Sequence, residues 1–332
     1  MPVSRIPAEE SRPALDLFQG FAVSSVLAGL EMSGDLSALA ADGLDIESAP
    51  GRDGRERDLL AASLRYLAQR GLTRVDAGRY TLTSYGEAVY RDRGFLLWLV
   101  GGYGDPLRRL DAMLSLGKRF GVDVERDGRW VADGTTLMAR RHVLPDAMDL
   151  LGRIPVANVL DLGCGNARFL ISVCRIFGSR GVGVDISPAA YAEAEKAVAE
   201  EGLEQQVRLV LSDVRNLDEI PGLGEIQLVV AFYLLHEFLA VSREALVEYL
   251  SDLGRRIPPG AGLVIGEVEP PPPGAVGSLF TPEFSYVHAL MGQRLLSADD
   301  WGEVLAEGGF TLREVVRLSF PGAILLYGQR EP

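Results

Sequence analysis

The pattern of apolar and polar positions divides the chain into a mostly helical first part and a later part in which strands alternate with helices. Residues 13–32 form a long apolar run that predicts a helix, and a short helix is expected at 36–41. Residues 58–70 carry leucines at helical spacing. Residues 72–75 and 79–82 flank an Asp-Ala-Gly turn that is typical of a hairpin. Helices followed by a hairpin predict a winged helix.

The rest of the chain predicts connecting helices and then an α/β fold. Residues 95–116 and 135–151 are expected to be helical, with a polar loop at 121–134 between them. Seven strands are expected, at residues 158–162, 181–185, 208–211, 226–232, 262–267, 312–319 and 323–329. Strands alternating with helices predict a Rossmann-like, mainly parallel sheet, with its ligand at the carboxyl ends of the first, second and fourth strands.

Composition and charge narrow the function classes. The 332 residues suffice for two domains, and the net charge of −13 disfavours binding to nucleic acid or to an anionic membrane. We expect no secretory signal in residues 1–10 and no apolar run of membrane-spanning length. Only two cysteines are present, without a Cys-x-x-Cys pair, so a cytoplasmic location is expected.

A glycine-rich turn follows the first predicted strand of the later part. Asp161, Gly163 and Gly165 stand in the order D-x-G-x-G, and the glycines permit positive φ and close approach of a ligand. Asp185 ends the next predicted strand, where an acid can bind both ribose hydroxyls of a nucleoside. A dinucleotide loop is the main alternative, but its third glycine is replaced here by Phe169.

This turn resembles the first motif of class I S-adenosylmethionine (SAM) methyltransferases. The resemblance implies that Asp161 lies near the methionyl part of SAM, that Gly163 and Gly165 contact the cofactor, and that Asp185 binds its ribose. It also implies that Asp213 accepts a hydrogen bond from the adenine amino group. Phe232, at the end of the fourth predicted strand, is expected to line the cofactor or substrate cleft.

The order of parts resembles plant-type and bacterial O-methyltransferases, in which an N-terminal winged-helix domain exchanges helices with a partner subunit and covers the active site. The resemblance implies a homodimer. It also implies a dimerisation domain at residues 1–105, connecting helices at 106–150 and a SAM-dependent methyltransferase domain at 151–332.

The chain has three histidines, of which His236 follows the fourth predicted strand. Plant-type O-methyltransferases place a general base in a similar segment, usually followed by Asp and Trp. Glu237 and Phe238 stand at those two positions here, which is a departure from that pattern. His142 lies beside two arginines and is expected to be structural.

His288 stands 52 residues after His236, in an insertion expected to fold over the same cleft. Two histidines and a carboxylate can bind Zn(II) or Fe with open positions. The combination resembles the metal-dependent α-keto acid C-methyltransferases, the phenylpyruvate C-methyltransferase group. The resemblance implies that His236 and His288 hold a metal that chelates the substrate, with Glu237 as an uncertain third ligand.

The expected reaction is methylation of the β-carbon of an α-keto acid, in a route to a β-methyl amino acid for a natural product. A Lewis acid on the keto oxygen stabilises the enolate by several kcal/mol, so the β-proton can leave near neutral pH. One alternative is a metal-free O-methyltransferase with His236 as general base. Another is a non-catalytic SAM-binding regulator that uses the winged helix on DNA, which the acidic charge disfavours. The side chain of the keto acid is left open.

Overall fold

The computed structural model describes residues 13–47, 53–272, 274, 281–320 and 322–331. The segment for which no secretory signal is expected, residues 1–10, lies outside the described residues. The chain forms two compact units, Met1–Ala139 and Arg140–Pro332, each described here by itself. The finer division at residues 105 and 150 stays a prediction.

The N-terminal unit contains the predicted helices and hairpin. Its first elements are α1 (Pro13–Met32), α2 (Asp35–Asp42), β1 (Leu44–Asp45), α3 (Gly54–Gln69), β2 (Thr73–Asp76), β3 (Arg79–Leu82) and α4 (Ser84–Arg91). The three strands pair antiparallel in the order β1-β3-β2, and the β2–β3 hairpin is confirmed. Ala77 and Gly78 both have positive φ, as a two-residue hairpin turn requires.

α3 begins four residues before its predicted start because polar side chains cap it. The carboxylate of Asp53 accepts a hydrogen bond from the amide of Glu56, and the Glu56 side chain accepts from the amide of Asp53. This reciprocal capping box satisfies two N–H groups that a helix start leaves without partners. The apolar periodicity does not begin until the capped turn is complete.

The connecting helices are more broken than the sequence predicted. The helix expected at 95–116 is divided into α5 (Gly94–Leu96), a π-helix (Leu97–Gly102), α6 (Gly104–Arg108) and α7 (Leu110–Ser115). Glycines at the end of the π-helix and a proline in α6 interrupt regular α-helical hydrogen bonding. The loop expected at 121–134 is wrong from residue 128 onward, because α8 (Gly128–His142) begins there, and α9 (Leu144–Leu151) follows as a separate helix with Pro145 in its first turn.

α1 corrects the expectation that no apolar run reaches membrane-spanning length. Its 20 residues have a mean hydropathy of 1.3, so by length and composition alone it is able to cross a bilayer. A helix that docks on protein passes the same criterion, and Leu27, Ala28 and Leu30 of α1 are buried within the N-terminal unit. The finding is therefore weak support for a membrane span, and the cytoplasmic location stays a prediction.

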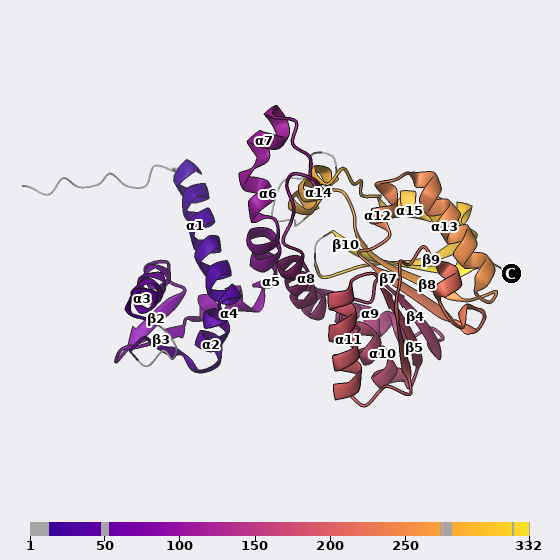
Figure 1. Cartoon of the computed structure of the whole chain (residues 1–332), viewed down its shortest axis with the longest axis horizontal. Helices are drawn as coiled ribbons and strands as arrows, with labels where there is room; N and C mark the ends of the chain where they lie inside the picture. The colour runs from indigo at the N-terminus through magenta and orange to yellow at the C-terminus, as the bar shows by residue number, and fades with distance from the viewer. Residues whose placement is uncertain (1–12, 48–52, 273, 275–280, 321, 332) are drawn as a thin grey trace, which may run out of the picture. The chain divides into compact units, whose positions relative to one another are not determined.

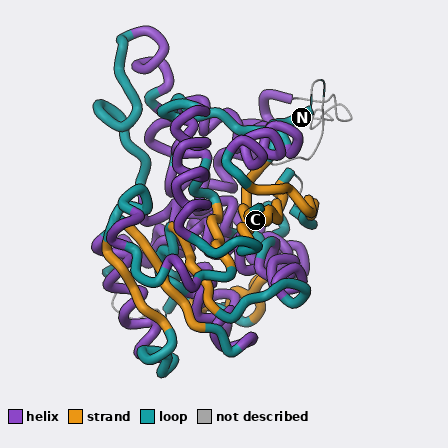
Figure 2. The backbone as a smooth tube through the Cα atoms, turned by 90° about the vertical axis from the view of Figure 1, so that its right-hand side faces the viewer, coloured by secondary structure: helices purple, strands orange, loops and turns teal. Residues whose placement is uncertain are grey.

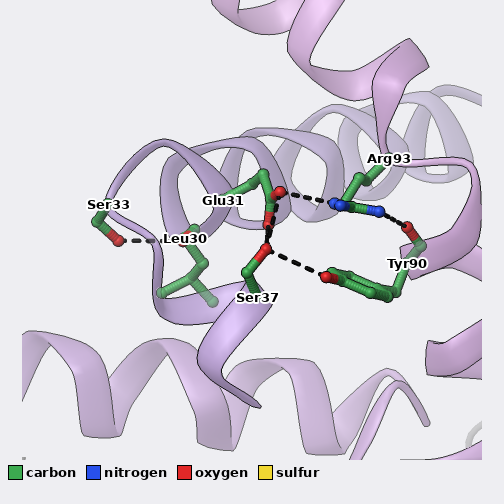
Figure 3. Close-up of polar contacts among 6 residues, drawn as sticks. All are labelled: Leu30, Glu31, Ser33, Ser37, Tyr90 and Arg93. Carbon is green, nitrogen blue, oxygen red and sulfur yellow. Dashed lines mark hydrogen bonds and ion pairs between the residues drawn. The ribbon is translucent and has the colours of Figure 1, made fainter. Parts of the chain in front are cut away.

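A half-buried ion pair joins the end of α1 to the start of α5. Figure 3 shows the Glu31 carboxylate between the Ser37 hydroxyl, at 3.0 Å, and Arg93 Nε, at 2.6 Å. The Arg93 guanidinium also lies 4.0 Å from the ring centroid of Tyr90, and the Tyr90 hydroxyl is 3.1 Å from Ser37 Oγ. These contacts connect α1, α2, α4 and the entry to α5 into one rigid block.

The second unit is a seven-stranded sheet covered by helices on both faces (Figures 1 and 2). Its strands are β4 (Asn158–Leu162), β5 (Arg180–Asp185), β6 (Val207–Leu211), β7 (Leu228–Phe232), β8 (Gly262–Val268), β9 (Phe310–Arg317) and β10 (Ala323–Arg330). Their order is β6-β5-β4-β7-β8-β10-β9; β10 pairs antiparallel with both β8 and β9, and the other neighbouring strands pair parallel. All seven predicted strands are present, so the predicted α/β, Rossmann-like class is confirmed.

The covering helices are α10 (Arg168–Phe177), α11 (Pro188–Glu200), α12 (His236–Leu239), α13 (Arg243–Arg256), α14 (Thr281–Leu290) and α15 (Ala298–Glu307). In Figure 1, α10 and α11 lie on one side of the sheet, and α13 and α15 lie on the other. The central strands are buried on both faces, as parallel strands under two helical layers are, and apart from the acids Asp161 and Glu267 they are mainly apolar. The chain order reverses between the neighbouring strands β4 and β7, and ligands of such sheets bind at the carboxyl ends of those strands.

Candidate active site

The turn after β4 has the open backbone that its sequence predicted. Gly163 and Gly165 adopt φ values of +70° and +54°, which side chains rarely tolerate. The amide of Gly163 donates to the carbonyl of Val184 at 2.8 Å, which fixes the turn against β5. A Cβ atom on Gly165 would meet nothing within 4 Å, so a ligand has room to approach the backbone there.

Asp185 closes this turn from the neighbouring strand. Its carboxylate accepts hydrogen bonds from the amides of Gly165, at 2.9 Å, and Ser187, at 2.8 Å. A carboxylate has about four acceptor positions, so about two remain for a pair of ribose hydroxyls. The geometry therefore fits the ribose role, which stays a prediction.

Asp161 is a buried carboxylate beneath the same turn. Its side chain is 4% exposed and forms no hydrogen bond to any residue that the structure describes. Burial, and to a smaller extent the charge of Asp185, raises the pKa of Asp161 to about 8. A positively charged ligand group placed nearby would be stabilised by the ionised form of this carboxylate, and SAM carries both a sulfonium and an ammonium group.

Asp213 follows β6 and is held by Arg215. Its oxygens accept hydrogen bonds from Arg215 Nε at 2.9 and 3.0 Å and from the Arg215 amide at 2.9 Å, and the side-chain bond lowers the pKa of Asp213. An adenine amino group would have to share this carboxylate with the guanidinium. Phe232 is half-buried, and its ring packs edge-on against Phe169 at 4.6 Å between centroids. The cofactor roles of Asp213 and Phe232 stay predictions.

His236 opens α12 directly after the turn that follows β7. Its Nδ1 lies 2.9 Å from Oε2 of Glu267, and its backbone amide donates to Oε1 at 3.3 Å. Glu267 is 1% exposed and His236 is 6% exposed, so the pair is shielded from bulk water. A buried ionised carboxylate needs such hydrogen bonds to offset its desolvation.

His288 lies beside His236, although 52 residues separate them in the chain. The ring centroids are 4.8 Å apart and the rings are nearly perpendicular, at 84°. His288 Nδ1 is 2.7 Å from the carbonyl oxygen of Phe284, one turn earlier in α14, and the Phe284 ring stacks on the imidazole at 3.9 Å. The predicted convergence of these two histidines is therefore present in the structure.

The partners of the two Nδ1 atoms determine which nitrogen of each neutral ring carries the proton. The Phe284 carbonyl can only accept a hydrogen bond, so Nδ1 of His288 is the donor there, and Nδ1 of His236 is the donor when the Glu267 carboxylate is ionised. The lone pair of each neutral imidazole then lies on Nε2. Histidine ligands of metals are oriented in this way, through an Nδ1–H bond to a carboxylate or a carbonyl.

Glu267 is the residue that the sequence reasoning missed. In the sequence, Glu267 is the last residue of an apolar predicted strand. An acid at the carboxyl end of such a strand could have marked it as a site residue, and the structure shows that this strand is buried throughout. Glu237, the predicted third ligand, is exposed; the hydrogen bond to Asp213 is the main cause that raises the pKa of Arg215, and the charge of Glu237 adds a smaller contribution. Within the described ranges, no group of three or more His, Cys, Asp or Glu side chains is arranged to hold a metal. The two imidazoles thus fit part of a ligand set, and the role of Glu237 stays a prediction.

His142 and Tyr233 complete the surroundings of the site residues. His142 is not part of the histidine pair, since its ring packs near Phe320 at 5.6 Å. The Tyr233 ring centroid lies 6.5 Å from that of Phe284. Burial and, secondarily, the charge of Glu267 raise the pKa of Tyr233, so its phenol is neutral near pH 7.

Comparison with known proteins gives matches to methyltransferases. Residues 159–260 match the family described as a methyltransferase domain. The chain is 27% identical to indolepyruvate C-methyltransferase of Streptomyces griseus over 274 residues, which are 81% of this chain and 80% of that protein.

Solved structures share the fold over nearly the whole chain. The mitomycin 7-O-methyltransferase MmcR superposes with a TM-score of 0.71 at 14% identity, covering 96% of each chain. CalO1, a methyltransferase in calicheamicin biosynthesis solved in its SAH-bound form, superposes with a TM-score of 0.66 at 19% identity, covering 97% of this chain and 100% of that one. These structures show the shared fold, and the methyltransferase-domain match and the similarity to a curated methyltransferase support a SAM-dependent methyltransferase enzyme.

Proposed function

We propose that this enzyme methylates the β-carbon of a 2-oxo acid, using a metal ion held by His236 and His288. The observation that carries the proposal is the pair of adjacent imidazoles, 4.8 Å apart, each with its Nδ1 fixed by an acceptor. The similarity to an indolepyruvate C-methyltransferase supports carbon as the methyl acceptor and a 2-oxo acid as the substrate class.

The residues of the site would have different roles in this reaction. Glu267 and the Phe284 carbonyl orient the two imidazoles, whose Nε2 atoms would be the metal ligands. The metal, when bound, supplies Lewis acidity toward the keto oxygen of the substrate. The β-carbon gives up a proton, and its electron pair attacks the methyl carbon as the methyl–sulfur bond breaks. The products are the β-methyl 2-oxo acid, S-adenosylhomocysteine and a proton.

The decisive experiment measures metal content and the position of the transferred methyl group. About one Zn or Fe per chain should co-purify, and His236→Ala and His288→Ala should each lose metal and turnover of a 2-oxo acid while still binding SAM. In the wild-type enzyme, the β-hydrogen should exchange with solvent deuterium even without SAM. His142→Ala is the matched control and should retain metal and activity. An enzyme that is fully active after metal removal would contradict the proposal.

A metal-free O-methyltransferase is the second candidate, and the His236–Glu267 pair favours it. A buried carboxylate on Nδ1 orients the imidazole, and the Nε2 lone pair can then accept a proton from a substrate hydroxyl. General base catalysis of this kind contributes about 10²–10⁴-fold in rate. Two measurements distinguish the two candidate functions. The metal-free O-methyltransferase requires the new methyl group to be on oxygen and the enzyme to remain active in the presence of a chelator.

We infer that the enzyme is a homodimer joined through the N-terminal unit. The first half of α1 exposes several large apolar side chains: Leu15, Leu17, Phe18 and Phe21. Two grooves of about 310 and 380 Å³ are lined partly by residues of α1, and several of the lining side chains are apolar. Exposed apolar surface of this kind is stabilised when a second subunit covers it.

A double substitution on α1 tests the dimer. Phe18→Glu with Phe21→Glu should yield a monomer by size-exclusion chromatography with light scattering, because charged side chains cannot be buried without partners. Val241→Glu is the control, since Val241 is equally apolar and exposed but lies in the catalytic unit. A double variant that remains a dimer would contradict this interface.

A further inference from the structure

Tyr233 has a backbone conformation that its side chain disfavours. Its φ is +53°, and the other non-glycine residues described with positive φ are the small Ala77 and Ala167. Ala77 forms the β2–β3 turn, and Ala167 precedes α10 beside the cofactor turn. For a bulky aromatic residue a left-handed conformation is an outlier, and such outliers concentrate at functional sites.

The neighbouring strand holds Tyr233 in this conformation. Its amide donates to the carbonyl of Gly266 at 2.8 Å, which extends the β7–β8 pairing by one residue. Gly266 has no side chain, and a Cβ atom there would lie 2.5 Å from the Phe232 ring. The left-handed turn at Tyr233 is therefore held by a backbone hydrogen bond to β8, and β8 is also the strand that carries Glu267.

The conformation places the phenol among the groups of the histidine pair. The Tyr233 ring lies 6.5 Å from Phe284, whose ring stacks on His288 and meets His236 edge-on at 6.4 Å. Burial and, after it, the charge of Glu267, the partner of His236, raise the pKa of the Tyr233 phenol. The phenol hydroxyl makes no hydrogen bond to any described part of the chain.

We propose that Tyr233 is a substrate-contacting residue whose hydroxyl donates a hydrogen bond to the substrate keto oxygen, which becomes negatively charged when the β-proton leaves. The location of the reaction at His236 and His288 is taken from the proposed function. A donor fixed in advance by the backbone stabilises the developing charge without reorganising at the moment of reaction. On this proposal, the strained backbone of Tyr233 orients its hydroxyl toward the substrate oxygen.

Tyr233→Phe tests the proposal because it keeps the ring and removes only the hydroxyl. We expect kcat to fall by about 10–100-fold, somewhat less than the loss of one donor in an oxyanion hole. SAM affinity should stay within about twofold of wild type, and β-hydrogen exchange without SAM should slow in parallel with kcat. Tyr327→Phe is the control, because Tyr327 lies beside Gly262 at the other end of β8.

The outcomes separate this inference from the proposed function. Unchanged kcat and KM in Tyr233→Phe would overturn the role of Tyr233, whatever the metal content of the enzyme. A methyl group found on oxygen would overturn the C-methylation proposal, and a kcat loss in Tyr233→Phe on that substrate would still support a substrate contact. Tyr233→Asn, which suits a left-handed backbone, keeps the test open if the phenylalanine variant is poorly folded.

Discussion

The cofactor edge and the histidine pair of the catalytic unit are built in different ways. At the cofactor edge, Asp161, Gly163 and Gly165 lie within five residues of sequence, and Asp185 ends the adjacent strand β5. The histidine pair is assembled from three distant segments: α12, β8 and α14. The cofactor edge can therefore be recognised from a short sequence motif, whereas the histidine pair forms only when the chain folds.

The two regions also differ in electrostatics. The cofactor edge brings together two carboxylates, Asp185, which accepts from two backbone amides, and the buried Asp161, and it suits a ligand with positive charge. The histidine pair is enclosed by Phe284 and a buried carboxylate, so polar interactions there act in a low dielectric. Substitutions should accordingly separate cofactor binding from chemistry.

The largest effect is expected from removing the imidazole of His236 or the carboxylate that orients it. His236→Ala should lower kcat by about 10²–10⁴-fold, and Glu267→Gln by about 10–100-fold, because the glutamine can leave Nδ1 without its acceptor. Calorimetry should show SAM binding close to wild type in both variants. A matched loss of SAM affinity would mean that the two regions are not separate.

The next effect concerns the cofactor turn. Gly163→Val should weaken SAM binding by at least about 100-fold, since a β-branched residue is strained at φ +70° and its Cβ would press on Leu234 at 3.3 Å. Gly178→Val is the control, because Gly178 has a similar φ of +68° and nothing within 4 Å. The control should lose stability in a thermal melt while retaining SAM affinity.

Asp185→Ala should weaken SAM binding by about 10–100-fold. The estimate takes a charge-assisted hydrogen bond as about 1.5–3 kcal/mol and counts the ribose contacts as partly replaced by water. Asp185→Asn should retain more affinity than the alanine variant, because one acceptor oxygen remains. Equal affinity for wild type and Asp185→Ala would show that the ribose binds elsewhere.

The smallest effect is a pH dependence caused by Asp161. If SAM binds best to the ionised carboxylate, affinity should rise about fivefold between pH 7 and 8, since the pKa is about 8. The folded-state pKa lies above the unfolded value, so the stabilisation that the protonated acid contributes to the free enzyme is lost as pH rises through about 8. Asp161→Asn should remove both trends, as measured by calorimetry and thermal melts across pH 6 to 9.

Periodicity and turn residues were sufficient to predict α1, the β2–β3 hairpin and the seven strands of the catalytic sheet. α1 and the central strands are continuous apolar runs, and the hairpin is marked by the residues of its turn. The pattern failed at α4 and β1, and at the boundary of α8, where capping, edge pairing and contacts with other elements decide the structure. Local propensity is too weak to determine such short or interrupted elements.

The sequence by itself determined the fold class and the open glycine turn after β4, because the glycines and the strand-end acids lie within or directly beside one tight turn. Only the tertiary structure decided that Glu267, and not the neighbouring Glu237, is the carboxylate on His236. It also decided the contact between His236 and His288 and the left-handed turn at Tyr233. These features depend on the pairing of β7 with β8 and on the packing of α14, which join residues too far apart in the chain for any local pattern to relate them.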